Sequence, residues 1–249
     1  MLCCALIQPP CRVGKVRGFA TFARDEPCYA KAMNEPFTVR DLGRLDYKEA
    51  WNVQLATHAA VAEGRETPTL LLVEHPPVIT FGRKGGRENL LVTEEFLKSK
   101  GFSLYDIERG GDITYHGPGQ LVGYPIFKVG RSAREFLRKI EGALVQMLEG
   151  YGLETCGSPG YAGVLLGEHL KIASIGVAIK RDVSFHGFAL NVSTNLNHFN
   201  YIVPCGLTDK TMTSMTEQLG REVLLEDVKP RVVASFENVF VKQRIAEAA

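Results

Sequence analysis

Residues 109–126 read RGGDITYHGPGQLVGYPI, a glycine-rich segment that runs directly into an apolar strand. The first twelve of these residues hold four glycines and a proline, which do not build a hydrophobic core. Glycine adopts positive φ without steric cost and lets a backbone approach a ligand closely. The segment matches neither of the glycine-rich patterns that bind dinucleotides or nucleotide phosphates. On its own it fits a tight turn as well as a binding loop.

The patterns on either side of this segment predict one mixed α/β domain. Apolar runs predict strands at residues 37–43, 69–73, 78–81, 103–107, 121–127, 162–166, 170–180 and 184–192. Helical spacing and capping residues predict helices at residues 46–64, 93–100, 132–151, 214–219 and 226–242. Because the strands cluster as hairpins instead of alternating with helices, we expect a mixed, mostly antiparallel sheet, an α+β arrangement.

The composition is ordinary for a soluble globular protein, with 45% hydrophobic and 23% charged residues. A net charge of +1 gives no support for a nucleic-acid partner, and no apolar run approaches the roughly 18 residues of a membrane span. The six cysteines include no CxxC pair and no zinc-ligand spacing. We therefore expect no metal site, and a reducing, cytoplasmic environment.

Residues 1–32 differ from the rest of the chain. They carry five basic residues against two acidic ones and show no sustained hydrophobic period. A transit peptide is one interpretation, but the stretch lacks serine. We expect instead an unstructured extension, or a start of translation at Met33, with a catalytic domain spanning residues 33–249.

Three single residues outside the glycine-rich segment are candidates for chemistry. Lys171 is the only charged residue in the apolar run 170–179, although a lysine at the start of a strand usually faces solvent. His186 lies near the start of the predicted strand 184–192, where a histidine is commonly a hydrogen-bonded polar residue. Cys205 lies between a proline and a glycine, a loop that suits an exposed thiol, whereas most free cysteines are buried and inert.

Together these elements make a specific combination. The glycine-rich segment is followed by KIASIGV at 171–177, HGFALN at 186–191 and PCG at 204–206, in that order. The series resembles the lipoyl(octanoyl) transferases of lipoate biosynthesis, from about Met33 to the last predicted helix. The resemblance implies a fold similar to the catalytic domain of biotin and lipoate protein ligases, and no cofactor.

The same resemblance implies a reaction and a site. An octanoyl chain would pass from acyl carrier protein to the lysine of a lipoyl domain through an acyl-cysteine thioester, with Cys205 as nucleophile and Lys171 as its partner. A thiolate suits this task because it attacks and leaves easily, which splits the transfer into two displacements. By position, the residues that line the acyl pocket would be Arg109, Gly110, Gly111, Asp112, Ile113, Thr114, Tyr115, His116, Ser174, Ile175, Gly176, Gly187, Phe188 and Ala189.

Two other functions stay open. An ATP-dependent lipoate or biotin protein ligase of the same fold would form an adenylate and need no nucleophilic cysteine. A non-catalytic acyl-carrier binding module would need neither Lys171 nor Cys205, so the presence of both residues favours the transferase. The fold alone does not separate these three functions. Basic residues within 83–87 and 131–139 are candidate docking groups for an acidic carrier, although a solvated surface explains them equally well.

We predict that a chain beginning at Met33 folds and keeps its activity, because residues 1–32 precede both the predicted elements and the resemblance. The measurement compares acyl transfer and the circular dichroism spectrum of the truncated and full-length chains. An inactive or unfolded truncation would make residues 1–32 a functional arm.

Overall fold

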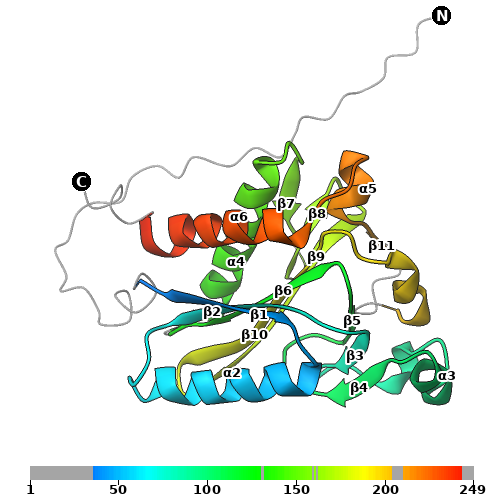
Figure 1. Ribbon diagram of the computed structural model, residues 1–249, viewed down its shortest axis with the longest axis horizontal. Helices are drawn as coiled ribbons and strands as arrows, with labels where there is room; N and C mark the ends of the chain where they lie inside the picture. Colours follow the sequence, from blue (N-terminus) through cyan, green and yellow to red (C-terminus); the bar gives the residue numbers. More distant parts are fainter. Residues whose placement is uncertain (1–35, 130–131, 159, 161, 204–209, 243–249) are drawn as a thin grey trace, which may run out of the picture.

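The computed structural model describes residues 36–129, 132–158, 160, 162–203 and 210–242 (Figure 1). Cys205 and the proposed N-terminal extension, residues 1–32, lie outside the described residues. In the part of the chain that is described, no helix is both long enough and apolar enough to cross a bilayer.

A main sheet carries most of the described strands, in the spatial order β1-β2-β6-β10-β9-β8-β7, with β11 beside β9. The β1–β2 and β9–β11 pairs are parallel and the other neighbours are antiparallel, which confirms the predicted mixed, mostly antiparallel sheet. The strands are β1 (Thr38–Arg44), β2 (Thr69–Glu74), β6 (Gln120–Ile126), β7 (Thr155–Gly157), β8 (Gly163–Leu166), β9 (Leu170–Lys180), β10 (Val183–Asn191) and β11 (Thr211–Met212).

A small sheet of order β4-β3-β5 stands beside the main sheet. It consists of β3 (Val78–Phe81), β4 (Ser103–Asp106) and β5 (Ile113–His116). The sequence did not predict β5, because its four residues lie between glycine pairs and form a strand only through antiparallel pairing with β3. The glycine-rich segment therefore contains a strand, and it leads the chain from the small sheet into β6 of the main sheet.

Helices cover both faces of the main sheet. Helix α2 (Tyr47–Ala62) lies on one face, and α4 (Ala133–Glu149) and α6 (Leu225–Glu237) lie on the other (Figure 1). Asp46 caps α2 by accepting from the Lys48 N–H, and Ser132 caps α4 by accepting from the Glu135 N–H. The remaining helical segments are η1 (Arg87–Asn89), α3 (Glu94–Ser99), η2 (Leu196–Tyr201), α5 (Met215–Leu219) and η4 (Asn238–Lys242).

Strand alternation divides the core into two layers. In β6, Leu121 packs toward α4 and α6, whereas Val122 and Tyr124 pack toward α2. The two faces of the sheet therefore meet different surroundings.

The strands β9 and β10 form a tight hairpin across the middle of the sheet. Arg181 and Asp182 both have positive φ, which is the conformation that a two-residue type I′ turn requires. Further along β10, a Cβ atom on Gly187 would stand 2.1 Å from the Gly123 carbonyl oxygen. Only glycine permits this close approach of β10 to β6.

Candidate active site

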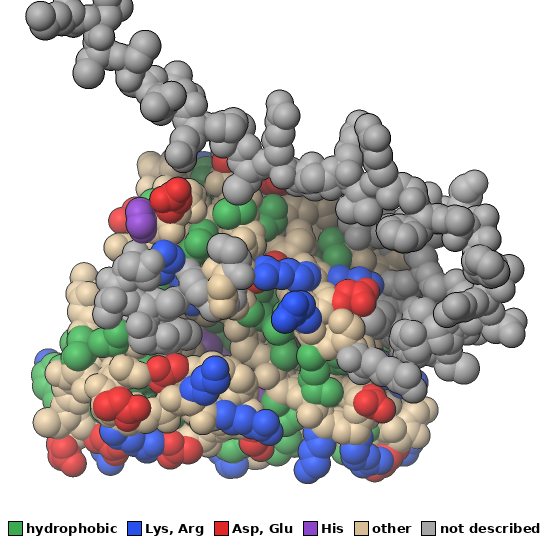
Figure 2. All heavy atoms as spheres, turned by 180° about the vertical axis from the view of Figure 1, so that it is seen from behind, with side chains coloured by type: hydrophobic (Ala, Val, Ile, Leu, Met, Phe, Trp, Pro, Cys, Tyr) green, Lys and Arg blue, Asp and Glu red, His purple; other side chains and the backbone are tan. Residues whose placement is uncertain are grey.

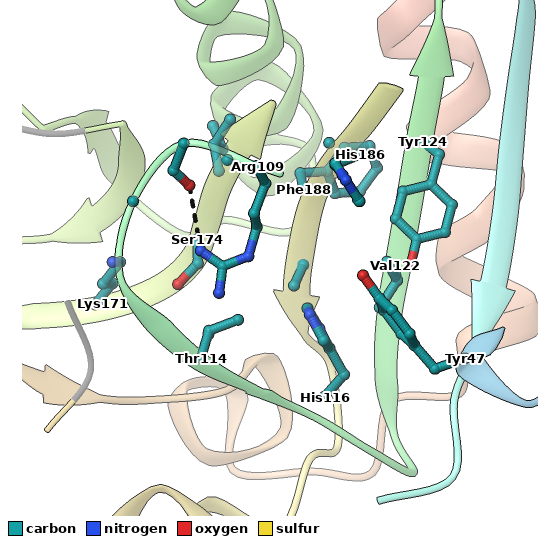
Figure 3. A pocket seen from close by; sticks show the side chains of 16 residues that line it. Tyr47, Arg109, Thr114, His116, Val122, Tyr124, Lys171, Ser174, His186 and Phe188 are labelled. Atoms are coloured by element: carbon teal, nitrogen blue, oxygen red, sulfur yellow. Dashed lines mark hydrogen bonds between the residues drawn. The ribbon is translucent and has the colours of Figure 1, made fainter. Parts of the chain in front are cut away.

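A cavity is lined by both sheets and by the first residue of α2 (Figure 3). Its volume is about 50 Å³, which is room for about four water molecules. The lining consists of Tyr47, Arg109, Gly110, Gly111, Thr114, His116, Val122, Tyr124, Lys171, Ser174, Ile175, Gly176, His186, Gly187, Phe188 and Ala189.

The structure brings three stretches that are distant in sequence to this one cavity. Ser174, Ile175 and Gly176 come from β9, and Gly187, Phe188 and Ala189 come from the adjacent β10. The glycine-rich segment contributes the wall opposite to them, with Arg109, Gly110, Gly111, Thr114 and His116.

Three residues of the predicted pocket face away from the cavity. Ile113 and Tyr115 alternate with the lining residues of β5 and pack into the core of the small sheet. The Asp112 carboxylate accepts from the Ile113 N–H and from the side-chain amide of Asn89, both over 2.6 Å. These three residues stabilise the conformation of the glycine-rich segment and do not line the cavity.

Four lining residues were absent from the predicted pocket: Tyr47, Val122, Tyr124 and His186. Val122 and Tyr124 carried a weak signal, since they share one face of the strand that follows the glycine-rich segment. Tyr47 carried none, because the first residue of a helix reaches a distant strand only through tertiary packing.

Lys171 is buried in the cavity wall, with 1% of its surface exposed. It lies on β9 opposite Leu165 of β8 and Met212 of β11. The Thr213 N–H also donates to the Lys171 carbonyl oxygen over 3.0 Å. The expectation of a solvent-facing lysine, which its position at the start of a strand alone would favour, is therefore wrong.

Both flanks of the segment that carries Cys205 are attached to the described structure. The Val203 N–H donates to the Asn89 carbonyl oxygen over 2.8 Å, and Thr211 pairs with the start of β9. Cys205 itself follows Val203 by two residues and lies outside the described residues. Cys156, a free cysteine of the described part, is exposed on β7 and does not line the cavity.

Arg109 extends across the cavity (Figure 3). Its Nη2 donates to both the carbonyl and the hydroxyl oxygen of Thr80, over 2.9 and 3.0 Å, and its Nη1 donates to the Gly110 carbonyl oxygen over 3.2 Å. The residue is buried. Because an arginine stays protonated in proteins, it gives the cavity a fixed positive charge.

A chain of buried hydrogen bonds orients His116. Its Nδ1 lies 2.8 Å from Gln120 Oε1, and Gln120 Nε2 donates to Asn191 Oδ1 over 2.9 Å. Asn191 Nδ2 in turn donates to the Thr213 carbonyl oxygen over 3.0 Å. An amide oxygen only accepts, so Nδ1 carries the imidazole proton and Nε2 keeps its lone pair. Burial, then the neighbouring His75, lowers the pKa of His116 to about 3.

A second buried pair lies at the Tyr47 end of the cavity. His75 Nδ1 donates to the Leu45 carbonyl oxygen over 2.8 Å, so its Nε2 accepts from the Tyr124 hydroxyl, also over 2.8 Å. Burial lowers the pKa of His75 to about 4. Burial also raises the pKa of Tyr124 and of Tyr47, so both phenols stay neutral.

His186 occupies an unusual backbone position, with φ at +56°. Its N–H donates to Gln54 Oε1 over 2.9 Å, which ties β10 to α2. Its Nε2 lies 3.5 Å from the Glu108 carboxylate, longer than a good hydrogen bond. Burial lowers the pKa of His186 to about 4, against the opposing effect of Glu108. Among the described residues, no group of His, Cys, Asp and Glu side chains is arranged to hold a metal ion.

Comparison with protein families gives one match over most of the chain. The model of the lipoyl protein ligase A/B catalytic domain matches residues 46–237. A protein of Deinococcus radiodurans named octanoyltransferase is 50% identical over 219 residues, which cover 82% of this chain and 65% of that relative. The octanoyltransferase of Caldicellulosiruptor bescii is 45% identical over 206 residues, which cover 81% of this chain and 90% of that relative.

Solved structures share the fold. Lipoate-protein ligase A bound with ATP superimposes with a TM-score of 0.65 at 18% identity, over 83% of this chain and 85% of that chain. A bipartite archaeal lipoate protein ligase system from Thermoplasma acidophilum gives a TM-score of 0.64 at 19% identity, over 83% of this chain and 84% of that chain. At these identities the likeness establishes the architecture alone, and it agrees with the fold expected from the sequence.

The buried histidines predict a loss of stability in mild acid. Unfolded histidine binds a proton near pH 6.5, whereas folded His75 binds one only near its pKa of about 4. The free energy of unfolding should therefore be level above about pH 6.5 and fall as the pH drops toward 4, by about 2 kcal/mol for each such histidine at pH 5.

Urea unfolding at pH 7.5 and pH 5 measures this loss. His75→Gln should lose about 2 kcal/mol less than the wild type between the two pH values. His169→Gln is the matched control, because His169 is exposed, and it should keep the wild-type pH dependence. An equal loss in wild type and His75→Gln would contradict a neutral, buried His75.

Proposed function

The chain belongs to the family of lipoyl protein ligase A/B catalytic domains, and we propose that within it the chain is an octanoyltransferase. In this proposal residues 33–249 form the catalytic domain. It moves an octanoyl chain from acyl carrier protein to the lysine of a lipoyl domain, through a thioester on Cys205. We assign the enzyme to the cytoplasm, a reducing compartment in which Cys205 remains a thiol.

The observation that carries the proposal is the position of Lys171. This lysine lies almost fully buried in a cavity wall, and the strand β11 that pairs beside it begins a few residues after Cys205. A buried lysine costs free energy to maintain, which is typical of functional sites rather than of solvated surfaces. The identity of 45–50% to proteins named octanoyltransferase supports the same assignment.

The proposed reaction has two displacements. In the first, the Cys205 thiolate attacks the thioester carbonyl carbon. A new C–S bond forms and the bond to the carrier sulfur breaks. Lys171 gives a proton to the departing carrier thiolate. In the second, the amine of the acceptor lysine attacks the acyl-Cys205 carbon. The C–N bond forms, the C–S bond breaks, and the proton lost by the amine passes to Lys171.

The thioester also separates this function from that of a ligase. A thioester is already activated, so the balance of both steps needs neither ATP nor a metal ion. The ligase-like architecture does not decide between the two, because one fold supports both chemistries. The two relatives named octanoyltransferase favour transfer.

The donor is proposed to dock beside the glycine-rich segment. The Arg83 and Lys84 N–H groups donate to the carbonyl oxygens of Arg109 and Gly111, so this loop packs directly on the cavity lining. The side chains of Arg83 and Lys84 are exposed. Figure 2 displays Lys and Arg side chains near the middle of the face opposite to that of Figure 1, next to apolar side chains. An acidic carrier would meet this basic loop at the cavity.

The remaining basic residues, Arg87 and those of α4, are less suitable for docking an acidic carrier. Arg87 pairs with Asp106 and with Glu94, so its charge is already compensated. The basic residues of α4 lie on the sheet face opposite to α2, away from the cavity lining. Exposed Arg134 of α4 is therefore a suitable reference charge for a docking experiment.

The proposal predicts an acyl adduct that forms without ATP or Mg²⁺. Incubation of the full chain with octanoyl carrier protein should add the mass of one octanoyl group, and Cys205→Ala should abolish the adduct. Cys156→Ala is the matched control and should keep it, since Cys156 lies outside the cavity lining. If free octanoate were used only with ATP present, the protein would be a ligase.

Lys171→Met should slow the transfer at pH 7 by at least about a hundredfold, because proton transfer contributes roughly 10²–10⁴ to such reactions. Tuning of the thiol alone would give only about threefold, since a more acidic thiol is also a weaker nucleophile. Raising the pH to about 9.5, where an unassisted thiol ionises, should restore only a small part of the loss. Full recovery at high pH would remove the acid–base role and leave Lys171 as a residue that tunes the thiol.

Reversal of the charge of Arg83 or Lys84, in the loop proposed to dock the carrier, should raise KM for the acyl carrier. We expect Arg83→Glu and Lys84→Glu each to raise KM for the acyl carrier by about tenfold at low salt, with little change in kcat, because screening acts on encounter. Arg134→Glu should leave KM near the wild-type value. A KM that does not respond to salt between about 0.05 and 0.5 M would exclude electrostatic docking at this loop.

A further inference from the structure

We infer that Tyr47 and Tyr124 form the end wall of the acyl cavity and set the longest chain that the enzyme accepts. This inference rests on the proposed function, and it assigns chain-length selectivity to Tyr47, which lies outside the sequence motifs, and to Tyr124, which was absent from the predicted pocket. Figure 3 shows Lys171 at one end of the cavity and the two tyrosines at the other. A chain whose carbonyl end lies beside Lys171 would therefore point its methyl end at the tyrosines.

The end wall is tightly packed. The Tyr47 ring stacks on Tyr105 at a centroid distance of 5.3 Å and an interplanar angle of 25°, and on His116 at 6.1 Å and 13°. The His75 ring lies 5.2 Å away. Only 2% of the surface of Tyr47 is exposed. The ring is enclosed by other rings, so it has no open space into which a longer chain could push it.

Hydrogen bonds also anchor the wall to the backbone. The Tyr124 hydroxyl donates to His75, and His75 donates to the carbonyl oxygen of Leu45, the second residue before Tyr47. Burial of one more methylene raises affinity by about fourfold. Breaking the buried hydrogen bond between Tyr124 and His75 lowers the affinity by roughly 5- to 150-fold. A chain that is one methylene too long therefore does not gain enough to displace the wall.

A second position controls the path to the wall. Val122 lies two residues before Tyr124 and lines the same cavity, because strand side chains alternate between faces. A larger side chain at Val122 would narrow the path to the wall, whereas a smaller one at Tyr47 would lengthen it.

The test measures the acyl adduct and the transfer rate with carriers that hold hexanoyl, octanoyl, decanoyl, dodecanoyl or tetradecanoyl chains. For Tyr47→Leu, the preferred chain should become longer, and the dodecanoyl-to-octanoyl rate ratio should rise by at least about tenfold. For Val122→Ile, the decanoyl-to-octanoyl ratio should fall by about fourfold, the effect of one methylene. Tyr47→Phe keeps the ring, so it should keep the wild-type length preference whatever its rate.

Opposite shifts in the two variants would support the end wall, because loss of stability alone does not move selectivity in two directions. Unchanged preference in folded Tyr47→Leu and Val122→Ile would overturn this inference and leave the octanoyltransferase assignment intact. A wild-type chain that takes no acyl group from any carrier would overturn the proposed function and the end wall with it. If Tyr47→Leu fails to fold, the decanoyl-to-octanoyl ratio of Val122→Ile alone tests the end wall.

Discussion

The buried amide hydrogen bond between Gln120 and Asn191 joins the strands on which the cavity is built. The two residues are register partners on β6 and β10, and their side chains meet over 2.9 Å. Gln120 also holds His116 of β5, and Asn191 holds the backbone just after β11, which pairs with β9 at Lys171. Loss of either amide would leave buried polar groups without hydrogen-bond partners, and each such group would lower the free energy of unfolding by about 1–3 kcal/mol. One pair of side chains thus fixes the small sheet, the main sheet and the lysine relative to each other.

Local patterns were enough to predict the long elements of the fold. The hairpin of β8 and β9, the capped helix α4 and the mixed sheet all follow from periodicity and capping residues that act within a few residues. The strands β5, β7 and β11 were not predicted. Glycines surround β5, whereas β7 and β11 have only three and two residues, and each of the three forms where a neighbouring strand offers a partner. Strand β5 contributes residues to the cavity lining and β11 pairs with β9 at Lys171, so part of the site depends on tertiary pairing.

The site shows the same division between local and tertiary information. The motifs placed β9, β10 and the glycine-rich segment near one another, but they do not state which alternate residues face inward. Ile113 and Tyr115 face the core of the small sheet although they lie inside the motif, and Tyr47 lines the cavity although it lies far outside. His186 looked unremarkable in the sequence, yet it lies within β10 with a positive φ and lines the cavity. These outcomes depend on packing between elements, which no single segment specifies.

The pKa shifts of the cavity lining bear on the role proposed for Lys171. His116 and His186 have pKa values lowered to about 3 and about 4, so neither changes protonation near neutral pH. Burial raises the pKa of Tyr47 and of Tyr124, which keeps both as neutral phenols, and an arginine such as Arg109 keeps its proton. Of the titratable side chains that line the described cavity, these shifts leave Lys171 as the candidate for the proton exchange proposed above. In the proposed reaction, this lysine would protonate the leaving thiolate and then accept a proton from the amine.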